Sequence, residues 1–192
     1  MAVQNITNDK ALWSLPKLDI RQFVVLALLM GLDIALGKLT VGTNVLKISF
    51  VFVAMSLIAK WYGPLWTMLI ATVLDVVNAT VISPSGTFFL GFTLSAISAG
   101  LIYALFYYEQ VHVSWLRIII AVGLVTVVVN IGMNTLWLFI MYTRVHTWDT
   151  YFALILPRMI KSAIMYPIQV IITYLFLNNA AVKQATKQIF NK

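Results

Sequence analysis

Four ionisable side chains lie in stretches of the sequence that are otherwise almost free of charge: Asp33, Asp75, Arg158 and Lys161. Inside a membrane span each would cost roughly 2.5 to 3.5 kcal/mol on insertion scales, so such groups usually serve a function. Arg158 and Lys161 directly follow Pro157 and are three residues apart, which places both on one face of a helix. Because like charges at this spacing repel each other, we expect an anionic ligand or a carboxylate to lie between them.

The two acids leave more than one interpretation open. Asp75 has Asn78 within one helical turn. A carboxylate beside an amide could read the donor edge of a nitrogen heterocycle, or it could bind a buried cation. In the simpler alternative, Asp33 or Asp75 pairs with Arg158 and Lys161 across the fold and the group has only a structural role.

A second polar set consists of neutral side chains at helical spacing. Thr126, Asn130, Asn134 and Trp137 follow one another at intervals of four, four and three residues. This spacing places a hydroxyl, two amides and an indole on one face of an otherwise apolar helix. The stripe must face protein or a cavity, and either a ligand or hydrogen bonds between helices, worth about 0.6 kcal/mol each in membranes, would explain it.

The elements that carry these residues are predicted to be membrane-spanning helices. The chain of 192 residues is 61% hydrophobic and 10% charged, and its mean hydropathy is +0.94. Residues 118–143 and 162–182 contain no Asp, Glu, Lys or Arg, and about 20 residues cross a bilayer core. The pattern lacks the strict alternation of a membrane β-barrel. We therefore predict an all-α polytopic integral membrane protein.

Breaks at charged and turn-forming residues divide the chain into six predicted helices in a single membrane domain, 1–192. Their approximate ranges are 22–39, 45–60, 64–82, 87–108, 116–142 and 151–177. The second is the weakest prediction, because only residues 48–59 are free of charge in it, so five spans remain an alternative. The net charge of +7 comes from basic residues near helix ends, which indicates membrane topology and not nucleic-acid binding.

The distribution of basic residues predicts the orientation. With six helices, eight of the 13 Lys and Arg residues fall on the side of the two termini, and this excess marks the cytoplasm. Residues 1–21 are mixed and polar, unlike a cleavable signal peptide. We expect residues 1–21 and 178–192 to be cytoplasmic tails.

Small residues predict two close-packing seams. Ala27, Gly31 and Ala35 recur at four-residue intervals in the first helix, and such repeats let another helix approach closely. Gly91 and Ser95 belong to a similar row in the fourth helix, which we expect to pack inside the bundle.

Several classes of function are excluded by what the sequence lacks. It has no cysteine, and neither His112 nor His146 has a second ligand at metal-binding spacing, so no metal site is expected. No P-loop is present, because Phe92 and Thr93 follow Gly91 where Lys and Ser or Thr would be needed. No catalytic grouping is found either. We predict neither an enzyme nor an ATP motor, and no cofactor.

A set of short motifs resembles one family of membrane proteins. The motifs are Lys47-Ile-Ser-Phe50, Tyr62-Gly-Pro64, Asp75, Pro84-Ser-Gly86, residues 89–96, Gly100-Leu-Ile-Tyr103, Asn134-Thr-Leu-Trp-Leu138, Pro157-Arg158, Lys161 and Pro167-Ile-Gln169. In combination they are similar to the substrate-binding S component of energy-coupling factor (ECF) vitamin transporters, folate family, and they cover residues 22–177.

The resemblance implies six helices around a pocket that opens to the outside of a bacterial plasma membrane. It also implies partners, namely a transmembrane coupling subunit and two ATP-binding-cassette ATPases. By the same resemblance, Ala27, Gly31 and Ala35 would dock the coupling subunit.

Folate is the substrate that the resemblance favours. Arg158 and Lys161 would bind its glutamate carboxylates, Asp75 or the stripe of Asn130 and Asn134 would bind its pterin, and Trp137 would stack on it. Lys47 completes the candidate substrate-binding residues. The sequence departs from the folate pattern after the second helix begins, where Phe52-Val-Ala-Met-Ser56 replaces a glycine-rich stretch, so pantothenate or hydroxymethylpyrimidine remains an alternative.

Two hypotheses from other classes are also left open by the residues. A self-sufficient small carrier or channel would use the buried charges along a permeation path. A purely structural membrane subunit would need neither Arg158 nor Asn134 to face a cavity.

Overall fold

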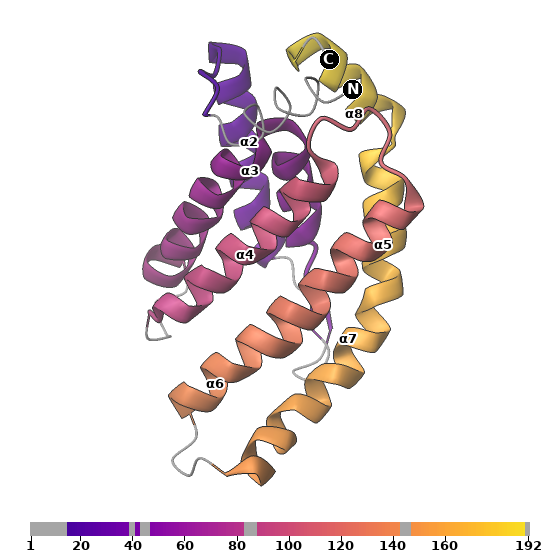
Figure 1. The fold of residues 1–192 in the computed structure, drawn as a ribbon. Coiled ribbons are helices and arrows are strands. Elements are labelled where there is room, and N and C mark those ends of the chain that lie inside the picture. The colour runs from indigo at the N-terminus through magenta and orange to yellow at the C-terminus, as the bar shows by residue number, and fades with distance from the viewer. Residues whose placement is uncertain (1–14, 39–40, 43–46, 83–87, 143–146, 191–192) are drawn as a thin grey trace, which may run out of the picture.

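The computed structural model of the chain is all-helical apart from one very short hairpin. It describes residues 15–38, 41–42, 47–82, 88–142 and 147–190. The elements in chain order are α2 (Ile20–Lys38), β1 (Val41–Gly42), β2 (Lys47–Ile48), α3 (Val51–Val77), η1 (Asn78–Ile82), α4 (Leu90–Tyr107), α5 (Trp115–Leu124), η2 (Val125–Met133), α6 (Asn134–Tyr142), α7 (Trp148–Leu177) and α8 (Ala180–Phe190). Figure 1 shows that α2 begins, and α8 lies, at the same end of the bundle.

The long helix α3 folds back on itself at Gly63. This glycine has φ +81°, and a Cβ there would come within 2.9 Å of the Tyr108 ring, so only glycine fits. Pro64 then starts the second arm at a position where its missing N–H is not needed. The Tyr62 hydroxyl donates to the carbonyl of Gln22 at the start of α2, whereas Lys38 at its end donates to the carbonyl of Ile82. The two arms therefore run in opposite directions beside α2.

With its two arms counted separately, α3 brings the number of long helical segments in the described chain to six, which confirms the predicted fold class. By length and composition, the described residues contain five helices that could cross a membrane, with 51–82 counted as one. The first arm, Val51–Tyr62, is only about 18 Å long at 1.5 Å per residue.

Two predicted boundaries differ from the structure. The helix expected from residue 45 begins at Val51, because Gly42 and Lys47 pair across the hairpin of β1 and β2, next to the turn-forming residues of 42–44. The tail expected over 178–192 contains the helix α8. Val182, Ala185 and Phe190 of this helix pack against the core, but α8 is too short and has too many polar residues for a span.

The packed core lies among α3, α4 and α5. Its fully buried side chains include Ile58, Ile70, Ala104, Tyr107 and Ile118. Gly100 lets α4 approach α3 closely, since a Cβ at this position would be 3.1 Å from the side chain of Thr67 in α3.

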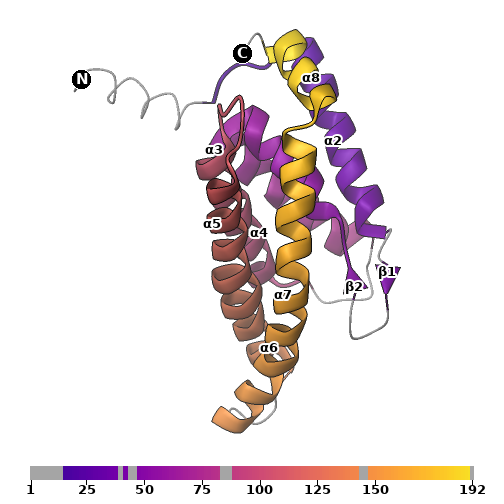
Figure 2. The same cartoon turned by 90° about the vertical axis from the view of Figure 1, so that its right-hand side faces the viewer.

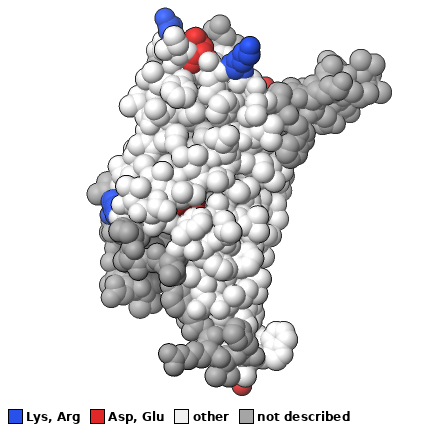
Figure 3. Space-filling view, turned by 90° about the vertical axis from the view of Figure 1, so that its left-hand side faces the viewer, with Lys and Arg blue, Asp and Glu red and all other residues white. Residues whose placement is uncertain are grey.

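Large apolar side chains cover much of the outside. Leu28 is 68% exposed, Leu90 73% and Leu175 63%. The face in Figure 3 is largely uncharged between its two ends, and Lys and Arg gather at the end that carries α8. A surface this apolar requires a lipid environment, so the structure agrees with an integral membrane protein.

Candidate substrate-binding site

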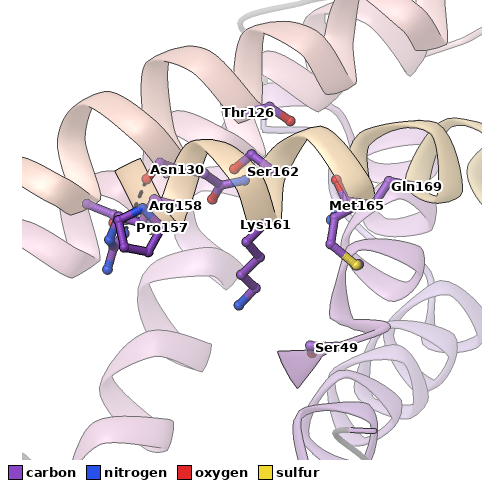
Figure 4. A pocket seen from close by; sticks show the side chains of 10 residues that line it. Ser49, Thr126, Asn130, Pro157, Arg158, Lys161, Ser162, Met165 and Gln169 are labelled. Carbon is purple, nitrogen blue, oxygen red and sulfur yellow. Dashed lines mark hydrogen bonds between the residues drawn. The ribbon is translucent and has the colours of Figure 1, made fainter. Parts of the chain in front are cut away.

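A cavity of about 420 Å³ lies between α7 and the continuous helix formed by α5, η2 and α6. This volume is in the range of small-molecule sites. Apart from Pro157 and Met165, the lining is polar or charged, and none of the described residues that form it has a carboxylate (Figure 4). The lining residues are Ser49, Thr126, Asn130, Asn134, Pro157, Arg158, Lys161, Ser162, Met165 and Gln169.

One wall of the cavity is a single face of α7. Arg158, Lys161, Met165 and Gln169 follow one another at steps of three, four and four residues, which project side chains in one direction from a helix, and Ser162 lies beside Lys161. A capping box between Thr147 and Thr150 fixes where α7 begins. The helix thus presents its polar residues as a line of about 16 Å from Arg158 to Gln169, at 1.5 Å per residue.

The opposite wall comes from a π-helical segment. In η2 the turn is widened, so the N–H of Asn134 donates to the carbonyl of Val129, five residues earlier. Such segments often occur at functional sites. Here it carries Thr126 and Asn130 and delivers Asn134 to the cavity. The polar stripe predicted from sequence therefore faces a cavity over its first three members.

Arg158 bridges the two walls. Its Nη1 donates to the backbone carbonyl of Asn130 at 3.3 Å (Figure 4). The acceptor is neutral, so the guanidinium keeps its charge uncompensated by this contact, and it has further N–H donors in a fixed planar fork. That geometry suits bidentate binding of a carboxylate.

Lys161 adds a second positive charge to the same cavity. Its side chain points from α7 into the open space in Figure 4. Neither Asp33 nor Asp75 forms an ion pair with Arg158 or Lys161 in the described part of the chain. Two cations that face one partly enclosed space without an acid favour an anionic occupant.

Asn134 supplies an acceptor to the lining. Its Oδ1 is buried and has no hydrogen-bond partner in the segments that the structure describes. A buried acceptor without a partner costs about 1 to 3 kcal/mol. Rotation of this side chain towards the cavity would let an occupant with an N–H donor relieve that cost.

Two of the candidate residues lie away from the cavity. The Trp137 indole N–H donates to Ser95 Oγ at 3.0 Å, and its ring lies 5.8 Å from that of Phe89. Asp75 accepts a hydrogen bond from Thr93 Oγ1 at 2.7 Å. Both side chains join helices, in the way that the alternative of interhelical hydrogen bonds expects.

Asp33 also lies outside the cavity lining. It is 2% exposed on α2, and its Oδ2 has no hydrogen-bond partner among the described residues. The Lys47 side chain lies outside the described part of the structure, although its backbone belongs to β2, two residues before the cavity residue Ser49.

Sequence reasoning missed four lining residues. Ser162, Met165 and Gln169 share the helix face of Arg158, so a helical projection of 151–177 would have found them. Ser49 belongs to the motif Lys47-Ile-Ser-Phe50, but it follows a hairpin and not a periodic segment, so helical spacing could not place it at the cavity.

The seam on α2 has the exposure that a docking surface needs. Ala27, Gly31 and Ala35 are all exposed, and a Cβ built on Gly31 would meet nothing within 4 Å. On α4, by contrast, a Cβ at Gly91 would lie 2.6 Å from the Trp137 ring. The α4 seam is therefore internal, as expected.

The sequence matches a known family over most of its length. The family model described as "ECF transporter, substrate-specific component" matches residues 21–177. The folate transporter FolT of Leuconostoc mesenteroides is 55% identical over 184 residues, covering 96% of this chain and 99% of that protein. The folate transporter FolT of Clostridium novyi is 35% identical over 152 residues, covering 79% and 84%.

A solved structure is similar as well. The crystal structure of FolT bound with folic acid superposes with a TM-score of 0.71 at 37% identity, covering 82% of this chain and 92% of that one. The family match spans all the membrane helices described above. The chain belongs to the family of substrate-specific components of ECF transporters.

Proposed function

We propose that this chain captures folate at the outer side of the bacterial plasma membrane, as the S component of an ATP-driven importer. One observation carries the proposal: Arg158 and Lys161 face a cavity whose described lining residues include amides on the opposite wall and no carboxylate. The two similar folate transporters and the similar structure with folic acid support the choice of folate.

The binding mode follows from the chemistry of the two walls. The two carboxylates of the glutamate moiety are bound by Arg158 and Lys161, which supply the planar fork and a point charge respectively. The pterin has N–H donors and ring acceptors, which match the amides of Asn130, Asn134 and Gln169. Met165, 6% exposed, offers a polarizable contact for a flat ring.

Asp75 and Trp137 act indirectly in this proposal. Asp75 links α3 to α4 through Thr93, and Trp137 fixes α6 against α4 through Ser95. Trp137 thereby holds the helix that carries Asn134 in place, whereas Asp75 holds α3 against α4. Lys47 stays a candidate contact, on the segment that leads to Ser49.

Transport requires partners in this proposal, namely a transmembrane coupling subunit and two ATPases. The exposed stripe of Ala27, Gly31 and Ala35 on α2 is where the coupling subunit docks, because small residues allow close helix contact. Both termini are cytoplasmic, so the end with α8 and its lysines faces the inside.

The substrate is tested by thermal unfolding of the purified chain with folate, pantothenate or hydroxymethylpyrimidine. A ligand at 100 times its dissociation constant stabilises by about 2.7 kcal/mol. We expect a rise in the midpoint with folate alone. A shift with only one of the other two compounds, or with none, would overturn the proposal.

Docking is tested separately with Gly31→Leu. The larger side chain enters open space in the isolated chain, so folate binding should be unchanged, while co-purification with the coupling subunit and ATPases should be lost. Leu28→Ala, which shortens an exposed side chain next to the stripe, is the control. Normal assembly by Gly31→Leu would exclude this surface.

A further inference from the structure

The short helix α8 lies across the end of the bundle where α2 begins and α7 ends (Figure 2). Val182 faces inward and is buried, whereas Gln184, Lys187 and Gln188 are exposed. Helix α8 is not among the helices that could cross a membrane, and none of its described residues lines the substrate cavity. Its contacts therefore call for another role.

The inner face of α8 contacts α3 beside its break at Gly63. The indole N–H of Trp61 donates to Thr186 Oγ1 at 2.9 Å. The ring of Phe190 stacks on Trp61 at 5.5 Å and meets Tyr62 edge-on at 5.3 Å. Trp61 and Tyr62 are 8% and 2% exposed, directly before the break at Gly63. We name Trp61, Tyr62, Thr186 and Phe190 the clasp.

The clasp continues into α2. The Tyr62 hydroxyl donates to the Gln22 carbonyl at 2.6 Å, and the Gln22 side chain donates to the carbonyl of Ile189 in α8 at 3.4 Å. Helix α2 packs mainly against α3 and makes a smaller contact with α8. The position of α2 therefore depends on both sides of the clasp.

The end of α7, from which the chain continues into α8, is bonded to α3 and to the segment before α5. Lys60, 3% exposed, donates from Nζ to the carbonyl of Leu177, the last residue of α7, at 2.8 Å. Asn178 in the corner between the helices accepts from the N–H of Val113 at 3.1 Å and donates to its carbonyl at 2.9 Å. A shift at the end of α7 is therefore passed to α3 through Lys60 and to α8 through the corner of Asn178 and Asn179.

These contacts form a continuous path from the cavity to the docking stripe. The cavity side chains of Arg158 to Gln169 stand on α7, α7 ends in the fixed corner, and α8 joins that corner to α2 through the clasp. We propose that the clasp couples occupancy of the cavity to the position of α2, so that the loaded and empty forms dock on the coupling subunit with different affinities. This inference rests on the proposed function.

The coupling is reciprocal, because the factor by which substrate changes docking is the factor by which docking changes substrate affinity. The coupling is measured as the ratio of two folate Kd values in nanodiscs, that of the isolated chain and that of the assembled complex. Trp61→Phe and Thr186→Val each remove one partner of the same hydrogen bond with little change in volume. Gln184→Ala, on the exposed face of α8, is the matched control.

In wild type and Gln184→Ala we expect the two Kd values to differ by about fivefold or more. In Trp61→Phe and Thr186→Val, the Kd of the isolated chain should stay within about twofold of wild type, while the ratio of the two values falls towards one. An unchanged ratio in both variants, or a ratio of one in wild type, would overturn the inference. Failure of wild type to bind folate would instead overturn the proposed function.

Discussion

The cavity between η2 and α7 and the interfaces of α4 both contain polar side chains of otherwise apolar helices. The two regions differ in whether these side chains have hydrogen-bond partners. On α4, Thr93 pairs with Asp75 and Ser95 pairs with Trp137. At the cavity, Arg158 donates a hydrogen bond to a neutral backbone carbonyl, and Asn134 Oδ1 has no partner in the described segments.

The difference shows how a membrane protein separates structure from binding. A polar group in an apolar helix needs a partner, and neighbouring helices supply it where they touch. Where the helices are held apart by a cavity, a ligand must supply it. Residues of the first kind should affect stability, and those of the second kind should affect affinity.

Among the changes at the cavity, Arg158→Ala should weaken folate binding most. Loss of a partly buried charge partner costs about 2 kcal/mol or more, which is roughly a thirtyfold weaker folate Kd. Isothermal titration of the purified variant measures it. Arg158→Lys keeps the charge but not the planar fork, so its folate affinity should lie between those of wild type and Arg158→Ala. Wild-type affinity in Arg158→Ala would remove the basis for the binding mode.

Lys161→Gln should have the next largest effect. A hydrogen bond to a charged group contributes about 1.5 kcal/mol or more, so folate should bind roughly tenfold more weakly. Lys187→Gln makes the same chemical change at an exposed position of α8 and should bind folate normally. Equal affinities in the two variants would show that Lys161 does not touch the substrate.

The smallest effects should come from a matched pair of threonines. Thr93→Val leaves Asp75 without its donor and should lower stability by about 1 kcal/mol, with no change in folate affinity. Thr126→Val makes the same change on the cavity wall and should weaken binding by about 0.5 to 1.5 kcal/mol without lowering the unfolding midpoint. The reverse pattern would contradict the distinction between the two regions.

Much of the fold could be predicted from the sequence, because it depends on local patterns. Uncharged stretches and turn-forming residues placed the helices, and the predicted break between residues 60 and 64 coincides with Gly63. Helix α8 could not be found this way, since its packing depends on Trp61 and Tyr62, far away in the chain. The widened turn of η2 left no mark in an apolar sequence.

The candidate site was predictable only as far as helical spacing reaches. Spacing correctly put Arg158 and Lys161 on one face, and Asn130 and Asn134 on another. Whether a polar residue has a partner depends on a different helix. Asp75 and Trp137 therefore looked equivalent to Asn134 until Thr93 and Ser95 were placed against them.

The binding of folate and of pteroate, which lacks the glutamate moiety, to the purified wild-type chain tests the central claim most directly. Because Arg158 and Lys161 are proposed to bind the two glutamate carboxylates, isothermal titration should show pteroate binding at least roughly thirtyfold more weakly than folate. Equal affinities for the two compounds would contradict the account, since the glutamate carboxylates that Arg158 and Lys161 are proposed to bind would then contribute nothing to affinity.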